Sequence, residues 1–424
     1  MSTATTHIKT EKKLIPAMRF NEFEGDWSIK PLGSESNHIS YGLTVRPEFV
    51  EEGIPLISAR EITTGVVNID KGPKISQEEF NKLSDKAKPK QGDVFLTKTG
   101  TIGLSARFML DIPIAITQNI AVIRLNDEKV NSPVYLIQYF KTRDFYRSAI
   151  SRVNQSTIMD LQLGDIRKLL IPFPALPEQK KIASFLTAVD EKIQQLTKKK
   201  ELLGQYKKGV MQQLFSGQLR FKDKNGNPYP DWEEKRLGEI ADVTKLAGFE
   251  FTKHIVYRDK GEIIALRGLN IKNNTLDLNQ VKYIDDSDFS KLNRSKLFIG
   301  DLIYTYVGTI GEVAIIEEND RFYLAPNVSR IRFNEDECLA KFSIQYFINP
   351  VFKEREVGKY ISSSSQPALS MTNIRKFKIS LPSIPEQQKI ANFLSGIDTK
   401  IEAVSQQIAQ TQSFKKGLLQ QMFV

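Results

Sequence analysis

The sequence predicts an α+β protein: two repeated mixed α/β domains separated by two long antiparallel coiled-coil helices, with circular, pseudo-twofold symmetry. Three observations predict this class. The stretch "ALPEQKKIASFLTAVDEKI" at 175–193 recurs as "SIPEQQKIANFLSGIDTKI" at 383–401, strand-like segments recur at the same offset, and each copy ends in a long helical pattern. A repeat of this length indicates tandem copies of one unit rather than a solenoid. A chain of 424 residues is also long enough for two or three domains.

The first part of each copy predicts a mixed domain. "GDVFLTKTGTIG" (92–103) matches "GDLIYTYVGTIG" (300–311), and "TQNIAVIRL" (117–125) matches "APNVSRIRF" (325–333). Short apolar runs bounded by Gly, Pro, Asn and Asp are typical of strands. "VYLIQYFKTRDFYRSA" and "FSIQYFINPVFKERE" have helical patterns. The glycines of "GTIG" are expected to close a turn after a strand.

The second part of each copy predicts a long helix. Pro177 and Pro385 stand at the helix start, where the missing N–H of proline costs nothing, and Glu178 and Glu386 follow where a negative charge suits the helix dipole. About 38 residues in each helix correspond to about 57 Å. The apolar residues follow the 4–3 spacing of a coiled-coil seam. The seam positions expected between the two helices are Ile182, Leu186, Val189, Ile193, Leu196, Ile390, Leu394, Ile397, Ile401 and Val404.

Two lysines, Lys207 and Lys415, occupy equivalent places on this seam. They either set the register of the helix pair or extend their ammonium groups to solvent near loosened helix ends. So narrow an apolar stripe leaves neither helix stable alone, and the two helices are expected to pack on each other. Because each helix follows its own domain, the pair is expected to be antiparallel.

The expected organisation is an N-terminal arm at 1–25, a first mixed domain at 26–176, a first spacer helix at 177–215, a linker at 216–230, a second mixed domain at 231–384 and a second spacer helix at 385–424. The arm "LIPAMRFNEFEGDW" is similar to the linker "FSGQLRFKDKNGNPYPDW". We therefore expect a circular arrangement in which Phe20 of the arm lies near Met422 at the end of the second helix.

Composition restricts the class of partner and the compartment. The chain carries 60 Lys and Arg against 50 Asp and Glu, a net charge of +10, which favours a polyanionic partner although solubility alone also explains it. The single cysteine, Cys338, excludes an internal disulfide framework and fits a reducing compartment. No run approaches the roughly 18 apolar residues of a membrane span. We expect a cytoplasmic protein that has no membrane partner and no metal site.

Catalytic motifs are not expected in this chain. "GTIG" lacks the Lys-Ser/Thr of a phosphate-binding loop, and "NGNPYPDW" (225–232) has the wrong residue order for an amino-methyltransferase motif. "PDWEEK" (230–235) packs its acidic residues into one short segment, whereas a metal-dependent nuclease spreads them over neighbouring strands. No catalytic residue is therefore predicted.

The loops around the repeated strand supply polar side chains that could read DNA bases or hold phosphates. The first copy offers Arg60, Lys98, Thr99, Thr101, Arg107, Gln118, Asn119, Gln155 and Ser156, and the second offers Arg267, Tyr304, Tyr306, Thr309, Asn327, Ser364 and Gln366. The scaffold residues are kept while the exposed positions differ. Two such domains are expected to read two different half-sites. Arg167 and Lys168, repeated as Arg375 and Lys376, are either phosphate contacts or charged strand edges.

Two variable domains, each followed by "LPEQKKIASFL" or "IPEQQKIANFL" and a long helix, resemble the specificity subunit of a type I restriction–modification enzyme. The resemblance covers nearly the whole chain. It implies two target-recognition domains that each read one half of a bipartite site in double-stranded DNA, with helices that set the spacer and dock two methyltransferase (modification) subunits.

The same resemblance implies that this chain has no chemistry of its own. S-adenosylmethionine, ATP and Mg²⁺ are then expected on partner subunits, and restriction/translocase subunits join through the assembled complex. Two alternatives stay open at this point. One is a coiled-coil adaptor that joins two protein-binding domains, and the other is a self-contained methyltransferase or nuclease, which we do not expect.

Overall fold

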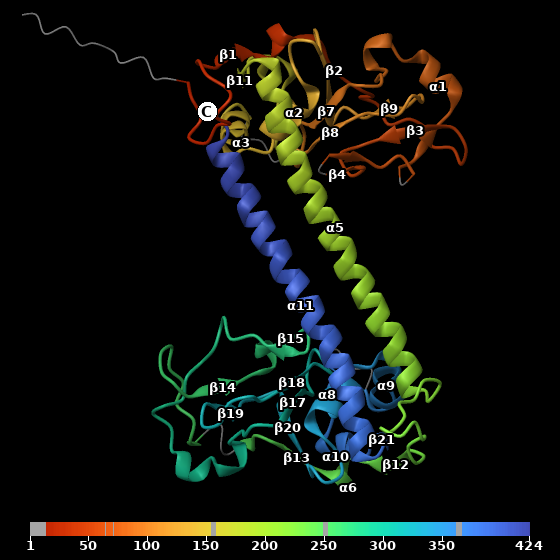
Figure 1. Cartoon of the computed structure of the whole chain (residues 1–424), viewed down its shortest axis with the longest axis vertical. Helices are drawn as coiled ribbons and strands as arrows, with labels where there is room; N and C mark the ends of the chain where they lie inside the picture. The colour runs from red at the N-terminus through yellow and green to blue at the C-terminus, as the bar shows by residue number, and fades with distance from the viewer. Residues whose placement is uncertain (1–13, 64, 71, 154–157, 249–252, 362–366) are drawn as a thin grey trace, which may run out of the picture. The chain divides into compact units, whose positions relative to one another are not determined.

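The computed structural model describes residues 14–63, 65–70, 72–153, 158–248, 253–361 and 367–424. The chain forms two compact units, one made of Met1–Thr197 with Gln406–Val424 and the other of Lys198–Ser405. Each unit contains one mixed domain, the first part of one long helix and the last part of the other (Figure 1). The long helices are α5 (Leu176–Phe215) and α11 (Ile384–Gln421), against expected spans of 177–215 and 385–424.

The first unit is built around a four-stranded antiparallel sheet in the order β2-β10-β7-β8. A smaller sheet has the order β6-β3-β9, with β3 and β9 parallel, and β1 pairs with β11. The strands are β1 (Ser28–Pro31), β2 (Ser36–Tyr41), β3 (Ile54–Ile57), β4 (Ile62–Thr63), β5 (Val66–Val67), β6 (Lys74–Ile75), β7 (Val94–Thr97), β8 (Ser105–Arg107), β9 (Ala115–Ile116), β10 (Ile120–Leu125) and β11 (Leu170–Phe173). The helices besides α5 are α1 (Gln77–Lys82), α2 (Pro133–Tyr139), α3 (Arg143–Ile150) and α4 (Leu163–Arg167).

The second unit repeats this topology. Its four-stranded sheet has the order β13-β20-β17-β18, the parallel pair is β14 with β19, and β12 pairs with β21. The strands are β12 (Glu233–Arg236), β13 (Ala241–Lys245), β14 (Ile264–Leu266), β15 (Ile271–Lys272), β16 (Thr275–Leu276), β17 (Leu302–Thr305), β18 (Val313–Ile315), β19 (Phe322–Leu324), β20 (Val328–Phe333) and β21 (Lys378–Leu381). The helices besides α11 are α6 (Leu237–Ile240), α8 (Ala340–Ile348), α9 (Pro350–Phe352) and α10 (Met371–Arg375).

Both faces of each central sheet are buried, which explains the continuous apolar runs of the repeated strands. Val94 and Leu96 of β7 face the core made with α2, α3 and the ends of the long helices, whereas Phe95 faces the small parallel sheet with Ile57 and Ile116. Period-two alternation along the strand therefore separates two apolar cores. The second unit divides its core in the same way.

The aspartate of the repeated Gly-Asp pair crosslinks the central sheet. Asp93 is buried, and Arg124 of β10 donates to its two carboxylate oxygens at 2.8 and 2.7 Å. Asp301 and Arg332 repeat this bidentate pair at 2.7 Å for both bonds. A buried carboxylate requires such a partner. The "GD" and "IR" motifs therefore recur for a structural reason.

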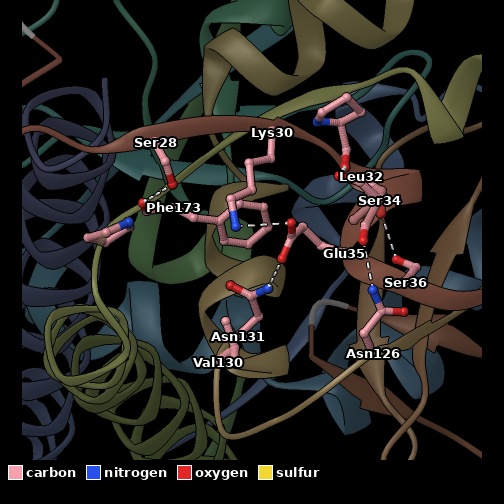
Figure 2. Close-up of polar contacts among 12 residues, drawn as sticks. Ser28, Lys30, Leu32, Ser34, Glu35, Ser36, Asn126, Val130, Asn131 and Phe173 are labelled. Atoms are coloured by element: carbon pink, nitrogen blue, oxygen red, sulfur yellow. Dashed lines mark hydrogen bonds and ion pairs between the residues drawn. The ribbon is translucent and has the colours of Figure 1, made fainter.

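The segment between β1 and β2 is fixed to the start of α2 by side-chain contacts (Figure 2). Glu35 accepts a hydrogen bond from Asn131 at 2.6 Å and lies 3.1 Å from the ammonium of Lys30. Asn126 donates to the carbonyl of Ser34 at 2.7 Å. These bonds hold the turn that follows the repeated tryptophan.

The long helices pack antiparallel within each unit. In the first unit, Ile182 and Leu186 of α5 share a core with Leu418 of α11 and with Met422 just beyond it, while residue 190 of α5 contacts residue 415 of α11. The partners thus run in opposite directions along the two helices. Of the expected seam positions, the structure buries Ile182, Leu186, Leu196, Ile390, Leu394, Ile397 and Val404 and half-buries Val189, Ile193, Ile401.

The expected circular arrangement is confirmed. The N–H of Met18 in the arm donates to the carbonyl of Gln421 at 2.8 Å, and Phe20 packs against the core that contains Met422. Phe20 also contacts Phe185 of α5 edge to face, with ring centroids 5.8 Å apart. The arm therefore closes the first unit at the end of the second helix.

The linker makes the matching contacts in the second unit. Phe221 lies edge to face with Phe393 of α11 at 5.7 Å. Arg220 reaches the carboxylate of Glu386, just as Arg19 of the arm reaches that of Glu178. The arm and the linker are therefore two copies of one structural element.

The glutamine of each "PEQ" motif fastens a long helix to its mixed domain. Gln179 is buried, accepts from the N–H of Ser132 at 2.9 Å and donates to the carbonyl of Pro174 at 2.8 Å. Gln387 makes the matching bonds to Leu339 and Pro382 at 2.9 Å each. The recurrence of "PEQ" thus reflects a joint: its glutamate binds the arm or linker, and its glutamine binds the domain.

Candidate nucleic-acid interface

The repeated "GTIG" forms the same tight turn in both units. Thr97 Oγ1 donates to the carbonyl of Thr101 at 2.6 Å and accepts from the N–H of Leu104 at 3.0 Å. Thr305 makes the two equivalent bonds in the second unit, at 2.6 and 2.9 Å. The hydroxyl of a single threonine therefore closes each turn between two sheet strands.

Gly100 and Gly308 show why these turns need glycine. Their φ angles are 77° and 76°, in the left-handed region that glycine adopts without a Cβ penalty. The Gly100 N–H donates to the carbonyl of Met159 at 2.8 Å, and the Gly308 N–H donates to that of Pro367 at 3.2 Å. The prediction of a structural turn is confirmed.

A cavity of about 560 Å³ opens in the first unit at the carboxyl ends of β3 and β9. Arg60 follows β3, Gln118 and Asn119 lie between β9 and β10, and Arg46 comes from the connection between β2 and β3. Because β3 and β9 are parallel, the segments that follow them meet at the same edge of the sheet. Three of the expected DNA-contacting residues therefore line one cavity.

The second unit has a cavity of the same volume, about 560 Å³, at the same place. Arg267 follows β14, Asn327 lies between β19 and β20, and Thr309 belongs to the "GTIG" turn. β14 and β19 form the equivalent parallel pair. The two units thus contain equivalent cavities that are lined by different side chains.

Strand register shows which positions correspond. Ile57 pairs with Ile116 in the first unit, and Leu266 pairs with Leu324 in the second. Counting on from these pairs, Ser58 corresponds to Arg267 and Arg60 corresponds to Leu269. The two arginines therefore enter their cavities from different positions, two residues apart.

The two arginines also differ in their surroundings. Arg60 is exposed, and no hydrogen bond from its guanidinium to the described part of the chain is found. Arg267 is half-buried and donates from Nη2 to the carbonyl of Gln280 at 2.8 Å, while its buried Nε has no partner in the described ranges. Arginine donors suit both the N7 and O6 acceptors of guanine and phosphate oxygens.

Lys98 is a correction to the expected set. Its side chain is 8% exposed, forms an ion pair with Asp160 at 2.7 Å and lies over the ring of Tyr41, with Nζ 5.8 Å from the ring centroid. The ammonium is already used inside the domain and is not presented to a ligand. Burial acts to raise the pKa of Asp160, but hydrogen bonds from Lys98 and Thr99 outweigh burial and hold that pKa below its ordinary value.

The second unit contains the same cation–π contact, but the lysine and the tyrosine occupy each other's positions. Lys245 lies over the ring of Tyr306, with Nζ 5.4 Å from the ring centroid. The positions correspond because Tyr41 pairs with Ala121 and Lys245 pairs with Ser329 in equivalent strands. Tyr306 is half-buried, and burial raises the pKa of its hydroxyl. The replacement of Lys98 by Tyr306 thus preserves a packing contact.

Tyr304 is also a correction, and Arg107 lies away from the cavity of its unit. Tyr304 is 1% exposed in the core of β17, because alternation along the strand turns it toward Phe347 and Phe377. Arg107 lies opposite Val94 at the far end of the sheet from the "GTIG" turn, and it pairs with Glu128 at 2.9 and 3.0 Å. Neither side chain reaches a cavity edge.

The other expected residues have various placements. Thr101 and Thr309 are exposed on the turns, and Thr99 is half-buried with its hydroxyl bonded to Asp160. Gln155, Ser156, Ser364 and Gln366 lie outside the described residues.

Arg167 and Arg375 have structural roles. Arg167 Nη2 donates to the carbonyl of Ile39 at 2.7 Å, and Arg375 makes the equivalent bond to Val243. Both side chains therefore satisfy carbonyls at the edge strands β2 and β13, which favours the strand-edge interpretation.

Sequence reasoning missed three cavity residues. Arg46 is exposed and stacks on Phe49, with its guanidinium carbon 5.0 Å from the ring centroid. Tyr257 and Lys282 line the second cavity. The cation–aromatic pair in "RPEF" is the one local signal that could have indicated the first of these.

The described part of the chain holds no group of three or more His, Cys, Asp or Glu side chains that could bind a metal ion. Burial raises the pKa of the Cys338 thiol to about 12, so this thiol stays protonated near neutral pH and is a poor nucleophile. Among the described helices, none is long and apolar enough to cross a membrane.

Comparison with known proteins identifies the class. Residues 48–204 and 229–412 match the family described as the type I restriction modification DNA specificity domain. The chain is 22% identical to the type I restriction enzyme MjaVIII specificity subunit of Methanocaldococcus jannaschii, over 94% of each chain. It is 24% identical to the EcoKI specificity subunit of Escherichia coli K12, over 94% of this chain and 88% of the other.

A solved structure has the same fold. The S subunit of a type I restriction–modification system from M. genitalium superposes with a TM-score of 0.58 at 16% identity, covering 97% of this chain and 99% of the other. The family match and the repeated fold thus define a DNA-recognition protein of the restriction–modification class. The chain belongs to the type I restriction modification DNA specificity domain family, and it is a type I specificity subunit. The coiled-coil adaptor is not favoured.

Proposed function

We propose that each unit reads one half of a bipartite site in double-stranded DNA through its cavity at the parallel strand pair. The observation that carries this proposal is the repeated cavity: about 560 Å³ in each unit, at equivalent strand ends, on one scaffold. Polar side chains differ between the two copies, which is what two different half-sites require. A net charge of +10 supports contact with the phosphate backbone.

The long helices set the number of unread base pairs between the two halves. The α5 helix has 40 residues and α11 has 38, so each is about 60 Å long. That length exceeds the roughly 34–36 Å between successive major-groove faces of B-DNA. The proposed gap between the half-sites is therefore compatible with the helix length.

Methyl transfer and cleavage belong to other subunits in this proposal. Two methyltransferase (modification) subunits dock on the repeated helix starts and domain flanks, and the restriction/translocase subunits join through the assembled complex. S-adenosylmethionine, ATP and Mg²⁺ bind those partners. The duplication of the whole unit, helix start and domain flank together, supports this assignment, because two copies of one partner need two copies of one surface.

The test uses the two cavity arginines as controls for each other. Arg60→Ala and Arg267→Ala are each assembled with the modification subunits, and binding is measured to the full site and to sites with one half scrambled. Each variant should lose roughly tenfold in affinity, only on DNA that retains the half it reads. Equal losses from both variants on every DNA, or no losses, would contradict the proposal.

A further inference from the structure

An aspartate on a long helix joins three elements in the first unit. Asp190 of α5 accepts hydrogen bonds from Lys415 of α11, from Gln138 of α2 at 3.2 Å and from Lys141, just beyond α2, at 2.9 Å. The helix pair and the mixed domain therefore meet at one carboxylate.

The second unit repeats this junction with the helices in exchanged roles. Asp398 of α11 accepts from Lys207 of α5 at 2.7 and 2.8 Å and from Gln345 of α8 at 3.0 Å. Asp398 and Gln345 correspond to Asp190 and Gln138 in the repeat. Lys207 and Lys415 are the two seam lysines whose role the sequence left open, and the pairing favours a role in register.

These junctions are sensitive to displacement. The side chains of Lys207 and Lys415 are each 12% exposed, and Gln138 and Gln345 are buried. A shift of either helix by one residue moves it by about 1.5 Å and separates the charges. A mostly buried ammonium that loses its partner is strongly unfavourable, so the pair selects one register of the seam.

We propose that Asp190 and Asp398 are positioning residues that hold each mixed domain at one register of the helix pair and thereby select the spacer length between the half-sites. This inference rests on the proposed function. The hydrogen bond from Gln138 or Gln345 is essential to this inference, because through it the aspartate holds the mixed domain as well as the partner helix.

The two junctions differ in one respect that makes a sharp test. Asp190 has two lysine partners, whereas Lys207 is the one lysine paired with Asp398 among the described residues. Exchanging the charges in the second unit, Asp398→Lys with Lys207→Asp, leaves the new lysine facing the amide of Gln345, which can turn its oxygen toward it. The same exchange in the first unit places the new lysine against Lys141.

The experiment assembles the full-length chain with its modification subunits and measures methylation of a DNA library that keeps both half-sites and varies the spacer. Asp398→Asn should raise the modified fraction at non-native spacers at least about fivefold, with half-site bases unchanged. The charge exchange in the second unit should restore the native spacer preference, and the exchange of Asp190 with Lys415 should not. Glu191→Gln, an exposed neighbour of Asp190 on the same helix, is the control and should keep the native profile.

The outcomes separate the two claims. A native spacer profile in Asp398→Asn, with both half-sites still required, would overturn the positioning role and leave the proposed function intact. Methylation that ignores one or both halves in the unsubstituted complex would contradict the proposed function itself. If the Asp190 variants do not fold, the Asp398 variants decide the matter alone.

Discussion

The carboxylate of Glu178 at the start of α5 is 1% exposed and depends on one arginine. Arg19 donates to its two oxygens at 2.7 Å each, from a side chain that is 13% exposed. Replacing Arg19 with methionine keeps the apolar part of the side chain but leaves the buried Glu178 carboxylate without its charged partner. Breaking a buried pair from one side costs about 3–5 kcal/mol, and we expect about 3 kcal/mol because the arginine reaches solvent.

The second unit supplies a matched comparison. Arg220 binds Glu386 with its guanidinium, and Trp232 Nε1 donates to the same carboxylate at 3.1 Å. In the first unit, Trp27 Nε1 is buried and has no partner within the described ranges. Arg220→Met therefore leaves one charge-assisted hydrogen bond in place, worth about 1.5 kcal/mol, and should cost about 1.5 kcal/mol in total.

Hydrogen–deuterium exchange on peptides that cover 176–186 and 384–394 measures these costs locally. At about 1.4 kcal/mol for each tenfold, Arg19→Met should speed exchange at the α5 start by about 150-fold, and Arg220→Met should speed it at the α11 start by about 10-fold. Lys181→Met, which removes an exposed ion pair with Glu22 on the same arm, should change exchange by less than about fivefold.

A second substitution checks the cause. Glu178→Gln in the Arg19→Met background removes the stranded charge and should recover most of the lost protection. Equal acceleration by the two arginine variants, or no recovery in the double variant, would refute the argument from a buried, singly supported carboxylate.

Three further predictions follow from single residues. In a salt titration of DNA binding by the assembled complex, Arg60→Ala should leave the slope of log affinity against log salt unchanged, because the proposal places its guanidinium on a base edge; a slope reduced by about one would show a phosphate contact instead. Burial acts to raise the pKa of Asp190, but hydrogen bonds from Lys415 and Lys141 hold that pKa below its ordinary value. The stability that ionised Asp190 contributes is therefore present above the unfolded pKa of about 3.9, and it is lost as pH falls through the lower folded pKa. The difference in Tm between Asp190→Asn and the unsubstituted chain should be constant from pH 7 to 5 and should shrink below about pH 4. Gly308→Ala should cost about 1–2 kcal/mol in urea unfolding from backbone strain alone, since no atom lies within 4 Å of the added Cβ.

The repeat made the large features of the fold predictable. Each copy had to contain the same elements, and the likeness of the arm to the linker was enough to place Phe20 beside the end of α11. The alternation of the buried strands and the 4–3 seam come from local periodicity, which one sequence carries in full. These features were predictable because they depend on short-range sequence periodicity and on the similarity of the two copies.

The candidate site was less predictable because it depends on which strand faces which layer. Lys98 is charged, and Tyr304 differs from its counterpart in the first copy, yet both side chains are buried. Their environment is set by Asp160 in one unit and by Phe347 and Phe377 in the other, which are distant in the chain. The contact of Lys98 with Asp160 joins distant parts of the chain and has no local signal, whereas strand alternation places Tyr304 on a buried face.

Arg46, Tyr257 and Lys282 were missed for the complementary reason. They come from connections whose sequences differ between the two copies, so the repeat does not point to them. Isolated backbone pairings hold these connections at the cavities: Leu43 pairs with Thr117 in the first unit, and Arg258 pairs with Tyr283 in the second.

Protection of DNA by the chain assembled with its modification subunits tests the central claim most directly. Footprinting on the cognate site should show two short protected patches of different sequence, separated by base pairs whose identity can be changed without loss of binding. A single continuous recognised patch, or protection that ignores sequence, would contradict the account of two repeated units reading two half-sites.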